Sequence, residues 1–371
     1  MKRLFLLNTT LALVLLVTII AHATALEVGA GEPYSTIQSA INAPVTGDTE
    51  FVYGGASGET IKNNNSDDSL DLFGITYGVD AFVAVGRDSS NEFPGVVFTS
   101  PDGMTWKKET SAYVRMPLES VTYGNNVYVA VGGNGEILTS DDSNSWKNSR
   151  SNSICDLKDV AYGNNLFITV GSGSITIPIP PNLFFHSWDI ILNSQDGITW
   201  HKRNLTSISY PYYYDFQGIT YGKDIFVAVG WYGAICTSPD GMNWTEQKFH
   251  PDEQYEFFRD VSFGENIYVV VGEWGVILTS PDGITWTVRV SDSTTQSDLN
   301  SVTYGNGLFV AVGNNGSIIT SSGGKKWETS YSGTIKNLYG VTFGNNTFIA
   351  VGEGGIVLIS PDGITWAKRD L

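Results

Sequence analysis

The sequence predicts an all-β fold, a seven-bladed β-propeller of four-stranded blades that follows a signal peptide and a short N-terminal segment. Three observations carry this prediction. One pattern recurs seven times between Gly74 and the C-terminus, each copy closes on a tryptophan, and the usual interval between copies is near 40 residues. A period of that length, built from short apolar strands, is typical of propeller blades. The residues that close blades 1 to 7 are Trp106, Trp146, Trp200, Trp244, Trp286, Trp327 and Trp366.

Residues 1–25 are ordered as in a signal peptide. A basic start at Lys2 and Arg3 precedes an apolar stretch that runs to Ile20, and small residues follow as far as Ala25. We expect cleavage after Ala23 or Ala25 and a secreted, periplasmic or cell-surface location. The alternative is an uncleaved membrane anchor. The polar residues 8–10 argue against it, because they leave an uninterrupted apolar run that is short for a membrane span. No later segment is predicted to cross a membrane.

The composition limits the class of partner. The formal net charge is −17, and loss of residues 1–25 removes two basic residues and no acid, which leaves 19 Lys and Arg against 38 Asp and Glu, or −19. Such a surface repels nucleic acid and anionic membranes. We therefore expect a monomer whose ligand is a glycan or a protein, with no nucleic acid, no cofactor and no metal. The two cysteines, Cys155 and Cys236, are expected to be unpaired.

Two short segments precede the repeats. Residues 26–61 include Val28–Ile41 and Phe51–Gly55, which resemble the opening of pectate-lyase-like right-handed β-helix domains of microbial surface proteins. No β-helix coils follow, so the resemblance does not imply polysaccharide lyase chemistry. Residues 62–73 are rich in Asn, Asp and Ser and are predicted to be a polar linker. Residues 74–371 are then the propeller.

Each repeat predicts four strands, named A to D in chain order. In every copy eight residues separate a first glycine from a second, as in Gly264 and Gly272, and the turn between them joins strands A and B as a hairpin. Strand B is apolar throughout, which predicts that neighbouring blades cover both of its faces. In five copies a Gly-x-x-Gly turn leads to strand C, and a turn of the Ser-Pro-Asp-Gly type leads to strand D.

The segment from strand C to the tryptophan resembles the Asp-box of bacterial neuraminidase-type repeats, and the repeat as a whole resembles the propellers of photosystem II assembly factors. The pattern Ser-x-Asp-x-Gly-x-Thr-Trp, laid on Thr279 to Trp286, places Pro281 where the aspartate belongs and Asp282 one place later. We interpret the displaced aspartates as turn formers whose carboxylates accept backbone N–H groups. They are Asp102, Asp196, Asp240, Asp282 and Asp362. The seven closing tryptophans are likewise predicted to be structural and to pack between blades.

The departures from the repeat indicate where a ligand binds. Strand direction alternates, so the B–C turns and the D-to-A connections share one face, and the variation between copies is confined to that face. The three tryptophans outside the repeat lie there, in blades 3 to 5. Aromatic rings with interleaved acids suit both sugars and protein interfaces. The candidate ligand-binding residues are Trp188, Trp231, Tyr232, Trp274, Glu273, His186, Tyr213, Asp215, Tyr255 and Phe257.

Three functions are open on the sequence alone. The favoured one is non-catalytic binding of a glycan or protein through the B–C-turn face of blades 3 to 5; the alternative reading of this face is that the longer loops bury their own aromatic residues. The second function is a glycoside hydrolase. A sialidase-related enzyme would need clustered arginines to bind a substrate carboxylate, and the scattered arginines of this chain argue against it. A hydrolase that uses two carboxylates stays open. Its candidates are Asp215, Asp252, Glu253, Glu256 and Glu273, from which no spacing selects a pair. The third is an assembly or scaffolding factor.

Overall fold

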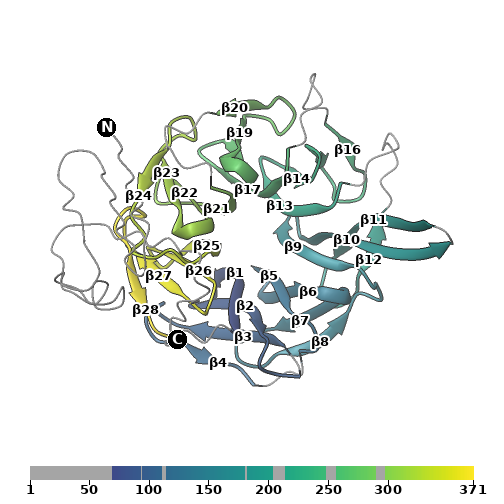
Figure 1. Cartoon of the computed structure of the whole chain (residues 1–371), viewed down its shortest axis with the longest axis horizontal. Helices are drawn as coiled ribbons and strands as arrows, with labels where there is room; N and C mark the ends of the chain where they lie inside the picture. The colour runs from purple at the N-terminus through teal and green to yellow at the C-terminus, as the bar shows by residue number, and fades with distance from the viewer. Residues whose placement is uncertain are drawn as a thin grey trace, which may run out of the picture. The chain divides into compact units, whose positions relative to one another are not determined.

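The computed structural model describes residues 69–92, 94–110, 114–179, 182–203, 214–247, 256–289 and 297–371, all of which belong to the unit Ser66–Leu371. In this part of the chain 28 strands form seven four-stranded antiparallel sheets, arranged as blades around a central opening (Figure 1). The predicted seven-bladed propeller is confirmed. The predicted signal peptide, residues 1–25, and the segment 26–61 lie outside the described residues.

Each blade takes four consecutive strands, with strand A nearest the axis and strand D at the rim. Strands A are β1 (Leu70–Gly78), β5 (Leu118–Gly124), β9 (Asp156–Gly163), β13 (Phe216–Gly222), β17 (Phe258–Gly264), β21 (Leu299–Gly305) and β25 (Leu338–Gly344). Strands B are β2 (Ala81–Asp88), β6 (Val127–Gly132), β10 (Leu166–Ile179), β14 (Ile225–Gly230), β18 (Ile267–Gly272), β22 (Leu308–Gly313) and β26 (Thr347–Gly352). Strands C are β3 (Gly95–Ser100), β7 (Glu136–Ser140), β11 (Asn182–Ser194), β15 (Ile235–Ser238), β19 (Ile277–Ser280), β23 (Ile318–Ser321) and β27 (Val357–Ser360). Strands D are β4 (Lys107–Lys108), β8 (Lys147–Arg150), β12 (His201–Arg203), β16 (Thr245–Glu246), β20 (Thr287–Arg289), β24 (Glu328–Ser330) and β28 (Ala367–Arg369).

The ring closes without exchange of strands between its ends. β1 begins at Leu70, within the predicted linker 62–73, and belongs to blade 1 alone, while β28 belongs to blade 7. The two blades meet through packing and through Asp71, whose Oδ1 accepts the Gly354 N–H at 3.2 Å. Within the described residues, no helix is long and apolar enough to span a membrane. Both cysteines are buried and unpaired, as expected.

The hydrophobic core lies between blades, and the closing tryptophans are part of it. Trp327 is 1% exposed and packs with Val269 and Ile277 of blade 5 and with Phe309 of blade 6. Its Nε1 donates a hydrogen bond of 3.1 Å to the Gly324 carbonyl. The other six tryptophans likewise pack in or against the clusters of buried residues between blades. All seven closing tryptophans therefore contribute to the packing between blades.

The turn between strands C and D is organised by its aspartate, as predicted. In blade 5 the Asp282 Oδ1 accepts the N–H groups of Ile284 and Thr285 at 2.9 and 2.7 Å, and the Ser280 hydroxyl accepts the Gly283 N–H at 2.8 Å. These hydrogen bonds stabilise the charged carboxylate and lower its pKa. The same arrangement recurs at Asp102, Asp142, Asp196, Asp240 and Asp362.

Blade 3 differs from the other blades in strands B and C. The sequence predicts a long B–C turn from Ser172 to Asp189, whereas β10 and β11 continue as paired strands out to Ile179 and Asn182. The β-branched residues of β10 favour this extended conformation. Figure 1 shows the resulting hairpin projecting from the ring.

Every strand A carries a β-bulge. The register between strands A and B skips one residue near the start of strand A, for example between Leu72 and Gly74 in β1. A bulge leaves this residue outside the ladder and re-aims its side chain. The bulge residues of blades 1 to 7 are Phe73, Glu119, Lys158, Gln217, Arg259, Asn300 and Tyr339, and all of them line the central cavity.

Candidate functional site

The B–C turn of five blades has a backbone that suits Asn-Gly. In blade 2, Asn134 and Gly135 have φ values of 52° and 71°, and the Glu136 N–H donates to the Gly133 carbonyl. Two consecutive residues with positive φ define a type I′ turn, in which Asn and Gly are strongly preferred. Blade 6 uses Asn315 and blade 7 uses Gly354 at the first of these two positions.

Blades 4 and 5 place aromatic residues at this left-handed position. Tyr232 has φ 59° and Trp274 has φ 58°, conformations that cost L-residues with bulky side chains free energy. Both side chains are exposed, 44% for Tyr232 and 73% for Trp274. The Trp274 N–H donates to the Asp298 Oδ1 at 2.9 Å, just as the Asn134 N–H donates to Asp156. The turns of blades 2 and 5 are therefore held in the same way, although the side chain at the left-handed position differs.

A short segment at the start of blade 5 links these two turns. The Glu256 carbonyl accepts the Gly233 N–H at 2.8 Å, and the Phe257 carbonyl accepts the Glu273 N–H at 2.9 Å. The Phe257 ring lies 5.8 Å from the Tyr232 ring, centroid to centroid. Tyr232, Phe257 and Trp274 are called the aromatic patch below.

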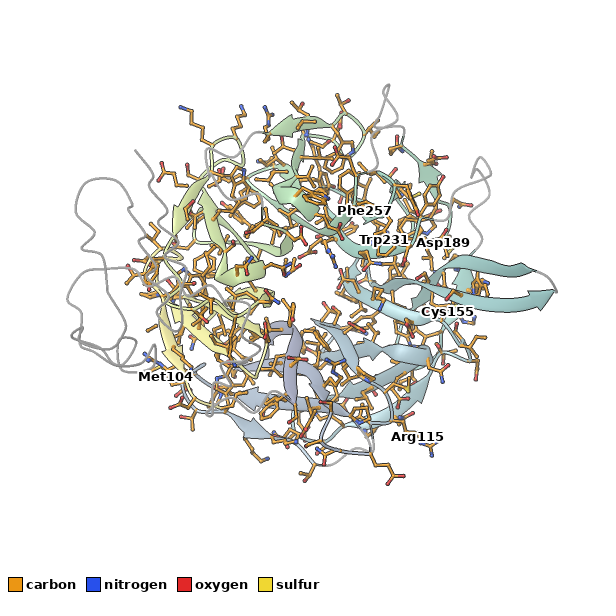
Figure 2. All side chains as sticks on the ribbon, in the orientation of Figure 1. Met104, Arg115, Cys155, Asp189, Trp231 and Phe257 are labelled. Carbon is orange, nitrogen blue, oxygen red and sulfur yellow. The ribbon has the colours of Figure 1, made fainter. Side chains whose placement is uncertain are left out.

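Trp231 lies against the aromatic patch and is half-buried. Its ring makes an edge contact with Phe257 at a centroid distance of 5.5 Å. Both residues are labelled in Figure 2. Its Nε1 is buried and has no hydrogen-bond partner among the described residues. The sequence predicts an exposed indole here because the turn is short; the Phe257 ring packs against it instead.

Trp188 belongs to the packing between blades 2 and 3. Its Nε1 donates to the Cys155 Sγ at 2.9 Å, and its ring packs against the buried cluster that contains Cys155, Leu157 and Ile190. The surplus tryptophans therefore divide into one exposed residue, Trp274, and two that are half-buried.

Two acidic candidates are engaged in hydrogen bonds. The Asp215 Oδ1 accepts from Ser172 Oγ at 2.6 Å and from Gln217 Nε2 at 2.9 Å, and Glu273 pairs with Arg259 at 2.6 Å. They serve as partners for neighbouring side chains. Tyr213, Tyr255, Asp252 and Glu253 and the side chain of His186 lie outside the described part of the chain.

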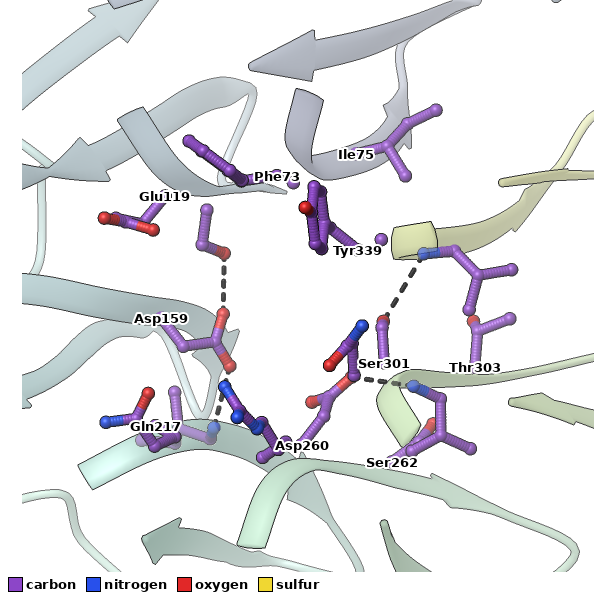
Figure 3. A pocket seen from close by; sticks show the side chains of 18 of the residues that line it. Phe73, Ile75, Glu119, Asp159, Gln217, Asp260, Ser262, Ser301, Thr303 and Tyr339 are labelled. Carbon is purple, nitrogen blue, oxygen red and sulfur yellow. Dashed lines mark hydrogen bonds between the residues drawn. The ribbon is translucent and has the colours of Figure 1, made fainter. Parts of the chain in front are cut away.

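The central cavity was not predicted from the sequence. Its volume is about 760 Å³, and strands A of all seven blades line it. Figure 3 shows Phe73 and Tyr339 on one side of it and Gln217 and Asp260 on the other. The signal in the sequence is the bulge position, which holds a different residue in every copy and follows a Leu or Phe in each.

Two aspartates that follow bulge residues join the blades. Asp159 accepts from the Ser120 hydroxyl of blade 2 at 2.6 Å and from the Ile219 N–H of blade 4 at 2.7 Å. Asp260 accepts from the Val302 N–H of blade 6 at 2.8 Å. Burial raises the pKa of both carboxyls, and the charge of Asp159 adds to the rise at Asp260. The hydrogen bonds that the carboxylates accept oppose these effects.

The comparisons with known proteins agree with the propeller architecture. Residues 238–371 match the family model described as the DUF6242 beta propeller domain. No curated protein matches the chain.

Three solved structures resemble the chain at low identity. YCF48 from Cyanidioschyzon merolae is 18% identical, with a TM-score of 0.57 over 78% of this chain and 95% of that chain. YCF48 bound to D1 peptide is 20% identical, with a TM-score of 0.51 over 68% and 81%. Virginiamycin B lyase from Staphylococcus aureus, as a selenomethionine derivative, is 13% identical, with a TM-score of 0.61 over 79% and 95%. Likenesses of this kind show a shared fold.

Proposed function

We propose that this chain is a non-catalytic binding protein whose ligand docks on the aromatic patch of blades 4 and 5. The observation that carries the proposal is Trp274, a 73% exposed indole held in a left-handed conformation. Strained residues cluster at functional sites, where the surrounding structure maintains them. Blades 2 and 6 show that this fold accepts Asn at the same position.

The proposed ligand is a protein, with a glycan as the second candidate. Exposed aromatic residues are enriched at protein interfaces, and hot spots of binding are enriched in Trp and Tyr. A propeller of the same fold has been solved with a peptide bound. The glycan is kept because aromatic faces also stack on the C–H faces of sugar rings. We further propose, from the predicted signal peptide, that binding takes place outside the cytoplasm.

The repeat itself supplies the test variants. Trp274→Asn combined with Tyr232→Asn gives both turns the residue that blade 2 carries, so the ring should fold normally. The control is Ile284→Asn combined with Met242→Asn, which places the residue of blade 2, Asn144, in the C–D turns of the same two blades. The side chains lost in the control are 56% and 46% exposed and lie on the opposite face.

The full chain and both double variants are applied to glycan arrays and to cell-surface protein extracts. We expect the wild type and the control to retain the same ligand and the patch variant to lose it. Equal retention by all three proteins would remove the aromatic patch as the binding site. A panel of glycosidase substrates tests the alternative: turnover abolished by a single carboxylate substitution would establish a hydrolase.

A further inference from the structure

The cavity mouth carries a set of side chains that the aromatic patch does not use. The bulge residues of blades 2 to 6 are Glu119, Lys158, Gln217, Arg259 and Asn300, all half-buried and all polar. Four of them end in planar carboxylate, amide or guanidinium groups, which offer paired donors and acceptors. Because bulges on seven strands aim these groups at one axis, they converge on a single space.

The charges in this arc are already balanced by neighbours. Arg259 contacts Glu273 at 2.6 Å, and Lys158 contacts Glu119 at 3.4 Å and Asp156 at 3.9 Å. An anion or a cation would have to compete with these ion pairs. The two other acids of the lining, Asp159 and Asp260, already accept hydrogen bonds from neighbouring blades and would repel an anion. Hydrogen-bonding capacity nevertheless remains on two acceptors. The amide nitrogens of Gln217 and Asn300 already donate, to Asp215 and to Asn314 and Leu338, so their side-chain carbonyl oxygens are left for a ligand among the described residues. The arc therefore favours a neutral ligand with many hydroxyl groups.

The opposite wall is aromatic. Phe73 of blade 1 and Tyr339 of blade 7 lie with ring centroids 5.5 Å apart, across the cavity from Gln217 and Asp260 (Figure 3). Arg87 is positioned 5.6 Å from the Phe73 ring centroid and is paired with Asp71, which holds this wall in place. Because the two ring planes are inclined at 52°, a flat ligand ring can stack on one of them at a time, and Arg87 already lies against Phe73. The Tyr339 ring, which faces an arc of planar polar groups, suits a ring with apolar faces and a polar edge.

We infer that the mouth of the central cavity is a second binding site, for a neutral polyhydroxylated ring such as a hexopyranose. The ring stacks on Tyr339, with Phe73 beside it, and its hydroxyl groups donate to the side-chain carbonyl oxygens of Gln217 and Asn300. The volume of about 760 Å³ lies within the usual range of small-ligand sites. This site does not depend on the aromatic patch and can bind when the patch does not.

The full chain is tested with methyl α-glucopyranoside, methyl β-galactopyranoside and methyl α-mannopyranoside, and with glucuronate as the charged comparator. Saturation-transfer NMR detects contact, and titration gives the affinity. We expect at least one neutral glycoside to bind, and to bind more tightly than glucuronate. Binding of glucuronate alone, or of none of the four at millimolar concentration, would overturn the inference.

Matched tyrosine variants locate the site. Tyr339→Ala should weaken the glycoside by about tenfold or more, the loss expected for a stacking contact. Tyr339→Phe should retain it, because blade 1 already carries Phe73 at this position. Tyr331→Ala removes a tyrosine that is 78% exposed in the same repeat unit and should change nothing. Equal affinity in Tyr339→Ala and Tyr331→Ala would place the sugar elsewhere. Trp274→Asn should leave glycoside binding intact, which separates this inference from the proposed function.

Discussion

The backbone conformation of two turn residues separates them from ordinary surface aromatics. Exposed apolar residues are common on any protein and need no explanation. Tyr232 and Trp274 differ because their φ angles of 59° and 58° disfavour the residues that occupy them. The hydrogen bonds that hold the turn come from the backbone, so they persist when the side chain changes.

Replacement of Trp274 by Asn should therefore not destabilise the ring. Asn tolerates the left-handed conformation, and the lost indole is 73% exposed. We expect the free energy of unfolding to stay level or to rise by about 0.5–1 kcal/mol, because Asn relieves part of the free-energy cost that the left-handed backbone imposes on Trp. Urea denaturation measures it. A fall of more than about 1 kcal/mol would show that the indole is packed in the native state.

The closing tryptophan of each blade packs in or against the apolar cluster that it shares with a neighbouring blade. Trp327→Ala should lower the free energy of unfolding by about 3–5 kcal/mol, because it removes a buried indole and leaves a cavity between blades 5 and 6. Trp327→Phe should cost less, since part of the volume is kept. A loss below about 1 kcal/mol for the alanine variant in chemical denaturation would contradict the packing.

The turn aspartates predict how stability depends on pH. Their pKa values are lowered, to about 2 for Asp142, Asp240 and Asp362, because each carboxylate accepts backbone N–H groups. Between that value and the unfolded pKa near 3.9, the unfolded chain binds more protons. The stabilisation is therefore present above pH 4 and is lost as the pH falls toward 2. Asp159 and Asp260 have raised pKa values, so above pH 4 the folded chain binds more protons at these two sites than the unfolded chain does. Their contribution to stability therefore falls as the pH rises.

Urea unfolding at a series of pH values from 5 to 2 tests this expectation. The midpoint should fall steadily below pH 4 in the wild type. A variant with Asp240→Asn and Asp362→Asn should be less stable at pH 5 and should lose less stability on acidification. Parallel pH curves for the two proteins would show that the turn carboxylates do not carry the effect.

The seven-fold repeat makes the architecture of the whole molecule predictable from its amino-acid sequence. The period, the invariant glycine spacing and the closing tryptophans each follow from one blade that cannot bury its faces alone, so neighbours must stack. The same logic identifies the aspartates as turn formers, since equivalent residues in several blades cannot all belong to one site. The exposure of Trp274 is also predictable, because a short turn has little room to hide an indole.

Features that depend on contacts between blades are not predictable in this way. Trp188 and Trp231 match Trp274 in sequence terms, yet Cys155 and Phe257 partly bury them. The lining of the central cavity comes from seven positions far apart in the chain, brought together by bulges that the repeat does not reveal. The insertion in blade 3 is placed correctly by the repeat, but its strand pairing depends on local β-propensity.

The role of Trp274 in ligand binding can be measured as one ratio of dissociation constants. The ligand retained by the wild type is titrated against Trp274→Asn and against Ile284→Asn, two single variants in blade 5 that remove exposed side chains from opposite faces. We expect the dissociation constant to rise about tenfold or more for Trp274→Asn, and to stay within about twofold of the wild type for Ile284→Asn. Equal affinity for both variants, or a loss confined to Ile284→Asn, would contradict this expectation.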